Sequence, residues 1–309
     1  MVSVKLLENR IEPDIEALLR VIRRQAMPNR IHHIELFLDE EIKEQICSRF
    51  GLAKDIRENE PFANLEKDIR LHEFLGYDAF RVWLLKDVFP TNTLSAYDTT
   101  AIAKQRREAR SWADEHTGPI QSWQDFESYH WPKVLDVDFR PLEWLEENLP
   151  ENMGCYHLTA HIFEHVLLLM GYESFCYKIF DEPDLVDAIF QKVGTFYVDF
   201  TRTLCNFRCI RIIWGSDDMG FRTSTMVSSQ ILKEKVLPWH KRCVAVSREH
   251  GRPYLLHSCG NLEEIMPALI SDVKIDAKHS YEDNIMPVTE AKRRYGQQIA
   301  ILGGIDVDF

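Results

Sequence analysis

His257 and Cys259, two side chains that bind transition metals, stand two positions apart in the segment 253–261. Apolar and aromatic residues lead into this pair, and Gly260 and Asn261 follow it, a pattern typical of a buried strand that ends at a turn. Side chains two apart in an extended strand point to the same side, so the imidazole and the thiol would project together. Such a nitrogen and sulfur pair suits Zn²⁺. The spacing is equally compatible with a histidine and a small cysteine that are merely buried.

Short apolar segments alternate with amphipathic ones through the second half of the chain. Strands are predicted at 209–214, 253–257, 273–278 and 299–302, and helices at 159–170, 182–205, 228–249, 262–270 and 287–295. This alternation predicts a parallel sheet with helical crossovers. Pro238 lies inside one predicted helix, where a kink or break is expected.

The first half of the chain extends the same pattern less regularly. Helices are predicted at 12–27, 39–50 and 141–149, and strands at 31–37, 76–83 and 153–157. Residues 84–140 break the alternation and are expected to form an insertion with a hairpin and a short helix. We therefore predict one domain over 1–309, a (β/α) barrel with this insertion. About seven strands are expected up to Phe309, one fewer than a closed eight-stranded barrel needs. The barrel could be open at that position, the sequence could be a fragment, or a partner protein could supply the missing βα unit.

Polar residues gather after the predicted strands, where a barrel presents its catalytic face. The candidates are Glu35, Asp217, Asp218, Arg222, His257, Cys259, His279 and Asp306. Asp217, Asp218 and His279 are predicted to be catalytic, although carboxylates after Gly215 and Ser216 are also common as cap or turn residues.

Glu35, Arg222 and Asp306 are predicted to bind substrate. Arg222 could pair with an anion, Asp306 follows two glycines that allow close backbone approach, and Glu35 could equally cap the next helix. His157, His161 and His165 are spaced four residues apart, which could place three metal ligands on one face of a helix. The apolar residues between them favour a packing role for that helix instead.

The charge and cysteine content exclude several classes of protein. The net charge is −12, from 49 acidic and 37 basic residues, which argues against non-specific binding to nucleic acid or to an anionic membrane. The N-terminus has no signal-peptide pattern, and no apolar run is long enough to span a bilayer. Seven cysteines without a CxxC pair are typical of reduced thiols, so we expect a cytoplasmic protein.

Several motifs together resemble the uroporphyrinogen decarboxylase superfamily. They lie at 215–221, 237–239, 256–261, 276–280 and 301–306, and weaker similarity extends over 159–195 and 28–35. The resemblance implies a (β/α)₈ TIM barrel, here without its last βα unit. It also implies one of two chemistries: decarboxylation of uroporphyrinogen, or corrinoid-dependent methyl transfer at a zinc ion.

Two features favour the methyltransferase branch. The arginine-rich N-terminal signature of the decarboxylases is missing, and residues 23–26 are its nearest fragment. His257 and Cys259 match the zinc-binding His-x-Cys pair of the methyltransferases, whose third ligand would fall beyond Phe309. The resemblance thus implies a zinc-dependent methyltransferase that uses a methylcobamide from a separate corrinoid protein and a small thiol acceptor.

Two alternatives stay open at this point. One is a true decarboxylase acting on the acetate side chains of a porphyrin precursor. The other is a non-catalytic barrel that only binds a corrinoid or tetrapyrrole. A barrel without its last unit also has a reason to pair with a second copy, so we consider a homodimer.

Overall fold

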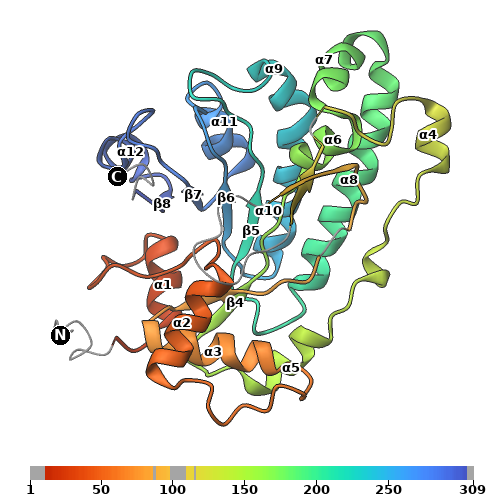
Figure 1. Ribbon diagram of the computed structural model, residues 1–309. Helices are drawn as coiled ribbons and strands as arrows, with labels where there is room; N and C mark the ends of the chain where they lie inside the picture. The colour runs from red at the N-terminus through yellow and green to blue at the C-terminus, as the bar shows by residue number, and fades with distance from the viewer. Residues whose placement is uncertain (1–10, 86–87, 98–108, 115, 305–309) are drawn as a thin grey trace.

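The computed structural model describes residues 11–85, 88–97, 109–114 and 116–304, so Asp306 lies outside the described residues. The described chain is an α/β structure in which parallel strands alternate with helices (Figure 1). The parallel strands are β1 (Ala79–Arg81), β4 (Gly154–Tyr156), β5 (Ile213–Ser216), β6 (Tyr254–His257), β7 (Ala277–His279) and β8 (Ala300–Ile301). An antiparallel hairpin, β2 (Thr93–Tyr97) and β3 (Ala109–Ala113), lies between β1 and β4 in the chain.

The helices are α1 (Ile15–Ile22), α2 (Glu40–Phe50), α3 (Ala63–Leu75), α4 (Trp123–Ser128), α5 (Arg140–Asn148), α6 (Ile162–Met170), α7 (Tyr172–Asp181), α8 (Pro183–Leu204), α9 (Ser229–Ile231), α10 (Leu237–Glu249), α11 (Met266–Ala268) and α12 (Val288–Tyr295). Most predicted helices are present, whereas α3 and α7 were not predicted and the helix predicted at 262–270 is shorter than expected. Within the described ranges, no helix combines the length and the apolar character needed to cross a membrane.

The break expected at Pro238 is confirmed. A π-helical turn, Leu232–Val236, runs directly into α10, and Pro238 lies in the first turn of that helix. Proline has no N–H to donate to a preceding carbonyl, so the regular α-helical ladder is interrupted just before it. The first turn of a new helix is the position where this loss costs least.

The parallel strands pair with one another in the order in which they follow along the chain. β5, β6, β7 and β8 form one parallel sheet, and β1 pairs with β4. A parallel bridge between Cys155 and Ile210 joins these two groups, and another between His33 and Tyr77 places the residues before α2 beside β1. The predicted parallel sheet is therefore confirmed. Among the described residues no backbone pairing joins β8 to the segment at His33.

The strand predicted at 31–37 is reduced to the single bridge at His33. Side chains rather than a backbone ladder hold this segment in place. The buried carboxylate of Asp78 accepts hydrogen bonds from Arg30 Nη2 at 2.5 Å, and His32 Nδ1 lies 2.8 Å from it. These charge-assisted contacts fix the segment without a regular strand.

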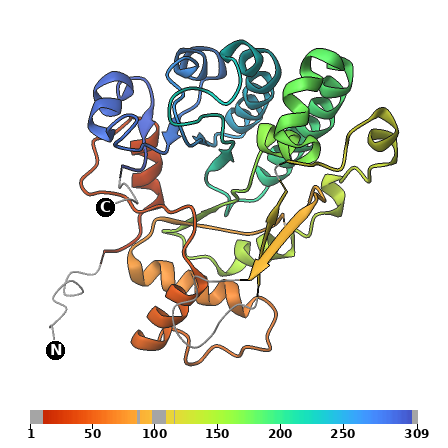
Figure 2. The ribbon, with the colours of Figure 1, turned by 45° about the horizontal axis from the view of Figure 1, so that its top comes forward.

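Helix α1 covers the N-terminal ends of the central strands (Figure 1). Its apolar face, Ile15, Leu18, Leu19 and Ile22, packs in one buried cluster with side chains from β1 and β4 to β8. The N–H of Ile15 donates to Asn152 O at 3.0 Å, just before β4. Arg23 donates to Gly251 O at 2.6 Å, shortly before β6. The carboxyl ends of the strands lie at the other end, which Figure 2 turns toward the viewer.

The opposite faces of the strands pack against the surrounding helices. This larger cluster includes Phe80, Phe163 and Tyr254, and it reaches α6, α8 and α10. Two buried clusters, one on each side of the same strands, make the strand ends a rigid platform for polar side chains.

Candidate functional site

The predicted metal pair meets a third ligand atom at the end of β6. His257 Nε2 lies 3.6 Å from Cys259 Sγ and 3.5 Å from Asp218 Oδ1. All three ligand atoms fall within 4.8 Å of one another. His257 is buried, Cys259 is half-buried, and the Asp218 side chain is 39% exposed, so one side of the group is open.

These distances fit a tetrahedral zinc ion. With Zn–S of about 2.3 Å and Zn–N or Zn–O of about 2.0 Å, two tetrahedral ligands lie about 3.3–3.5 Å apart. The separations of His257 Nε2 from Cys259 Sγ, 3.6 Å, and from Asp218 Oδ1, 3.5 Å, are close to those values. Nitrogen, sulfur and carboxylate oxygen are all zinc ligands, and three protein ligands leave a fourth position for a substrate.

Three contacts hold the loop after β5 against the loop after β6, and these two loops carry Asp218 and Cys259. A Cβ on Gly260 would lie 2.1 Å from Gly220 O, so the two loops touch through bare backbone. The N–H of Cys259 donates to Asp218 Oδ1 at 2.7 Å, and the N–H of Asn261 donates to Phe221 O at 2.8 Å. The loops after β5 and β6 are therefore held in one arrangement, with Asp218 facing the pair.

His279 contacts the other side of the His257 ring. The two Nδ1 atoms lie 2.7 Å apart, which is a hydrogen-bond distance between β6 and β7. Burial lowers the pKa of His257 to about 4 and that of His279 to about 3, so both rings are neutral at neutral pH. One Nδ1 must then donate to the other. If Nε2 of His257 binds a metal, its Nδ1 carries the proton and His279 accepts.

Asp217 has a different environment from the neighbouring Asp218. It is fully buried, and its carboxylate accepts the backbone N–H groups of Phe163 at 2.9 Å and Glu164 at 2.8 Å. N–H groups in the first turn of a helix have no acceptor within the helix, and the N-cap residue of α6, His161, accepts no hydrogen bond from them through its side chain. Asp217 therefore caps α6 from a distant loop.

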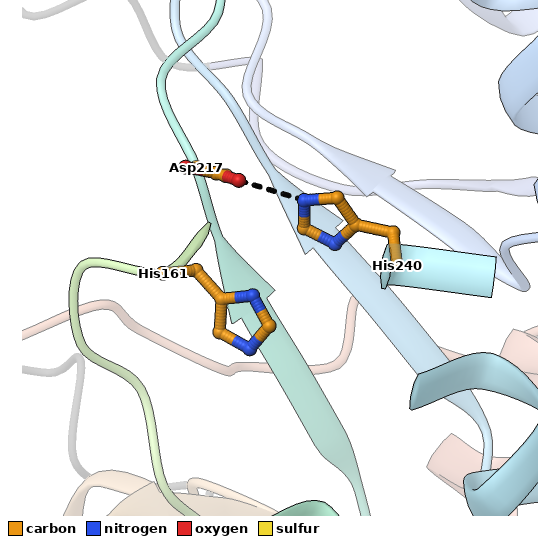
Figure 3. A group of neighbouring side chains, drawn as sticks. All are labelled: His161, Asp217 and His240. Carbon is orange, nitrogen blue, oxygen red and sulfur yellow. Dashed lines mark hydrogen bonds and ion pairs between the residues drawn. The ribbon is translucent and has the colours of Figure 1, made fainter. Parts of the chain in front are cut away.

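The same carboxylate also accepts a hydrogen bond from His240 Nε2, on α10, at 2.7 Å (Figure 3). Nδ1 of His240 lies 2.8 Å from the hydroxyl of Tyr254. Asp217 thus joins α6, α10 and β6 in one buried network, in which its carboxylate accepts three hydrogen bonds.

His161 completes a second group of metal-type ligand atoms with Asp217 and His240. Its ring stacks on that of His240 at 5.1 Å between centroids, and its Nδ1 is buried without a partner among the described residues. Both ring nitrogens of His240 are already hydrogen-bonded, to Tyr254 and to Asp217, so this ring has no free nitrogen for a metal. We interpret this group as structural, in line with the packing role expected of the helix.

Two buried ionisable residues beside the site were not predicted. Lys278 is 3% exposed, and its Nζ donates to Ser258 O at 3.1 Å and Ser280 O at 2.6 Å. Burial lowers the pKa of Lys278 to about 8. Burial also raises the pKa of Glu164 well above its usual range, and its Oε2 has no partner among the described residues. A lysine within an apolar predicted strand was the available signal for the first of these.

Glu35 and Arg222 do not belong to the group of ligand atoms around His257. Glu35 lines a small cavity of about 30 Å³ with Arg81 and Trp83, and its Oε1 accepts the N–H of Leu36 at 3.1 Å. Arg222 is exposed in the loop after β5. Asp306 lies outside the described residues.

Comparison with known proteins identifies the family. A family model described as uroporphyrinogen decarboxylase (URO-D) matches residues 119–309. Among solved structures, the chain is similar to a methyltransferase from Methanosarcina mazei with a TM-score of 0.67 and 13% sequence identity, covering 94% of this chain and 83% of that one. At this identity the similarity concerns the fold. No curated protein matches the chain in sequence. Since the family model spans more than half of the residues, the chain belongs to the uroporphyrinogen decarboxylase family.

Proposed function

We propose that this protein is a zinc-dependent methyltransferase that moves a methyl group between a methylated corrinoid and a small thiol. The observation that carries the proposal is the spacing of His257 Nε2, Cys259 Sγ and Asp218 Oδ1, which fits three tetrahedral zinc ligands. Family membership and the fold shared with a methyltransferase support it. We further propose that the strands belong to a (β/α) barrel, with a separate corrinoid protein as the methyl donor.

Each residue of the site has a proposed role. His257, Cys259 and Asp218 hold the metal, and Asp218 takes the place that the sequence motif assigns to a distant cysteine. Bound there, zinc supplies Lewis-acid activation that lowers the pKa of an acceptor thiol at the open position. His279 fixes the tautomer of His257 by accepting its Nδ1–H. Asp217 positions the site by anchoring α6.

The first test is zinc content by elemental analysis. Wild type is expected to hold about one zinc per chain, and His257→Ala and Cys259→Ala are expected to lose it, because two remaining ligands bind weakly. Cys176→Ala is the matched control, since Cys176 is also half-buried but lies outside the group. A well-folded wild type without zinc would remove this function.

Replacement of His279 separates a positioning role from a purely structural one. His279→Ala is expected to lower zinc affinity about 10- to 100-fold, because His257 loses the acceptor that fixes its tautomer. His279→Asn retains an acceptor oxygen and should recover part of the loss. Affinity is measured by competition with a chromogenic chelator. Equal affinities for wild type and His279→Ala would show that the contact at 2.7 Å does not orient the ligand.

Decarboxylation of uroporphyrinogen is the second candidate, because the family model that matches carries that activity in its description. The two candidates differ in what the zinc-loaded protein turns over. Methyl transfer from methylcobalamin to a thiol supports the first function. Release of CO₂ from uroporphyrinogen without dependence on Cys259 supports the second.

A further inference from the structure

Lys278 is a buried lysine beside the His257 group, and the proposed function gives it no role. Among the residues that the structure describes it is the only lysine or arginine that is buried, with 3% of its surface exposed. In the parallel register it pairs with Leu256, whose side chain belongs to the helix-facing cluster. Its alkyl chain therefore lies in the apolar layer between the sheet and the helices. A charge in that layer costs free energy that an apolar side chain would not.

Backbone carbonyls at the carboxyl ends of two strands hold the Lys278 ammonium. Nζ donates to Ser258 O at 3.1 Å, in the loop after β6, and to Ser280 O at 2.6 Å, in the loop after β7. It also lies 4.6 Å from the centroid of the Tyr281 ring, a cation–π contact. None of these three partners carries a charge, so hydrogen bonding alone does not explain why a cation stands here.

The acidic groups that act on Lys278 belong to the His257 group or lie beside it. Ser258, which accepts from Nζ, directly precedes the ligand residue Cys259. Burial lowers the pKa of Lys278 to about 8, and the side chains of Cys259, Asp218 and Glu282 act in the opposite direction. The ammonium is therefore charged at neutral pH, and it interacts with two of the three proposed metal ligands.

A charge count shows the effect of this ammonium on a ligand at the open position. The two positive charges of a zinc ion balance the Cys259 thiolate and the Asp218 carboxylate, and His257 is neutral. An anion at the fourth position then adds a negative charge that these groups do not offset. The Lys278 ammonium supplies a positive charge from the helix-facing side. Because Lys278 is buried, water screens this charge only weakly.

We propose that Lys278 makes the open position of the His257 group selective for an anionic ligand, because its ammonium compensates for the charge that such a ligand adds. The inference rests on the proposed function, in which that ligand is the thiolate of the methyl acceptor. Lys278 is then a specificity-determining residue rather than a catalytic one. Its N–H groups face two carbonyls and an aromatic ring, so it acts on the ligand through its charge and not through contact.

Alkylation of Cys259 by two reagents tests the charge of Lys278 without any metal. Iodoacetate is an anion and iodoacetamide is its neutral counterpart, and at one pH both meet the same fraction of thiolate. The ratio of their rate constants at Cys259, followed by mass spectrometry of the metal-free protein, therefore reports the local potential. Lys278→Met is expected to lower the iodoacetate-to-iodoacetamide ratio by a factor of about 3 to 10. Lys274→Met is the matched control, because Lys274 precedes the same strand but is exposed.

Two small ligands test the same charge in the metal-loaded protein. Cobalt(II) replaces zinc in this test because its visible spectrum changes with the ligand at the open position. Azide is an anion and imidazole is neutral, so Lys278→Met is expected to weaken azide binding about tenfold and to leave imidazole binding unchanged. Lys278→Gln should behave like Lys278→Met, because glutamine keeps a hydrogen-bond donor but no charge. Azide binding at the wild-type level in Lys278→Gln would show that the hydrogen bonds matter and the charge does not.

The outcomes separate this inference from the proposed function. A wild type that binds neither zinc nor cobalt removes the metal function, yet an alkylation ratio lowered by Lys278→Met and not by Lys274→Met still supports the charge effect at Cys259. Equal alkylation ratios in wild type and Lys278→Met, or equal azide affinities, overturn the inference. If Lys278→Met fails to fold, Lys278→Gln is measured in its place.

Discussion

Asp217→Asn is expected to lower the free energy of unfolding by on the order of 3 kcal/mol. The carboxylate of Asp217 is fully buried and accepts hydrogen bonds from two N–H groups of α6 and from His240. An asparagine places an NH₂ group against at least one of these donors, so a buried donor is left without an acceptor. Urea unfolding followed by circular dichroism measures the change.

Asp218→Asn provides the matched control, because it makes the same substitution one residue along the chain. The Asp218 side chain is 39% exposed, and an asparagine oxygen can still accept from the N–H of Cys259. Its effect on unfolding should stay below about 1 kcal/mol. Zinc affinity should respond mainly to Asp218→Asn. Equal destabilisation by the two substitutions would contradict the division of roles between Asp217 and Asp218.

Zinc affinity is expected to rise about tenfold per pH unit between about pH 6 and pH 9, or roughly a thousandfold in all. Burial raises the pKa of the Cys259 thiol to about 11, so the metal-free protein holds this proton throughout the range. A zinc ion binds the thiolate, so each ion bound releases that proton and higher pH favours binding. His257, whose pKa is lowered to about 4, is already neutral and releases none.

Two measurements check this pH dependence. Chelator competition at several pH values gives the slope, and an indicator in weak buffer counts about one proton released per zinc. A flat profile would mean either that Cys259 is already a thiolate or that it is not a ligand. Zinc retention by Cys259→Ala distinguishes these two explanations.

Much of the fold could be predicted because apolar periodicity reports local packing. The helix predicted at 182–205 is α8, Pro183–Leu204, and the strand predicted to end at His257 is β6. Helix α3 was not predicted, because it is rich in charged residues and one of its few buried positions is a histidine, His72. The residues at 31–37 read as a strand, yet the buried Asp78 holds them through side chains.

Two kinds of signal predicted the site: spacing within one strand end, and position after a predicted strand, which selected Asp218 and His279, both of which contact His257. His257 and Cys259 lie on one strand end, so period-two spacing placed them together. No local signal distinguishes Asp217, which caps α6, from Asp218, which faces the His257 group, because those partners lie about 40 to 50 residues away.

The position of α1 has a consequence for the traffic of ligands. Because Ile15, Leu18 and their neighbours fill the N-terminal ends of the strands, no route to His257 opens from that side in the described part of the chain. The carboxyl ends of the strands, where His257 lies, therefore remain as the side from which a ligand approaches the His257 group. If the proposed methyl transfer takes place at the His257 group, donor, acceptor and product would use the same side of the protein, and a product that dissociates slowly would delay the next round.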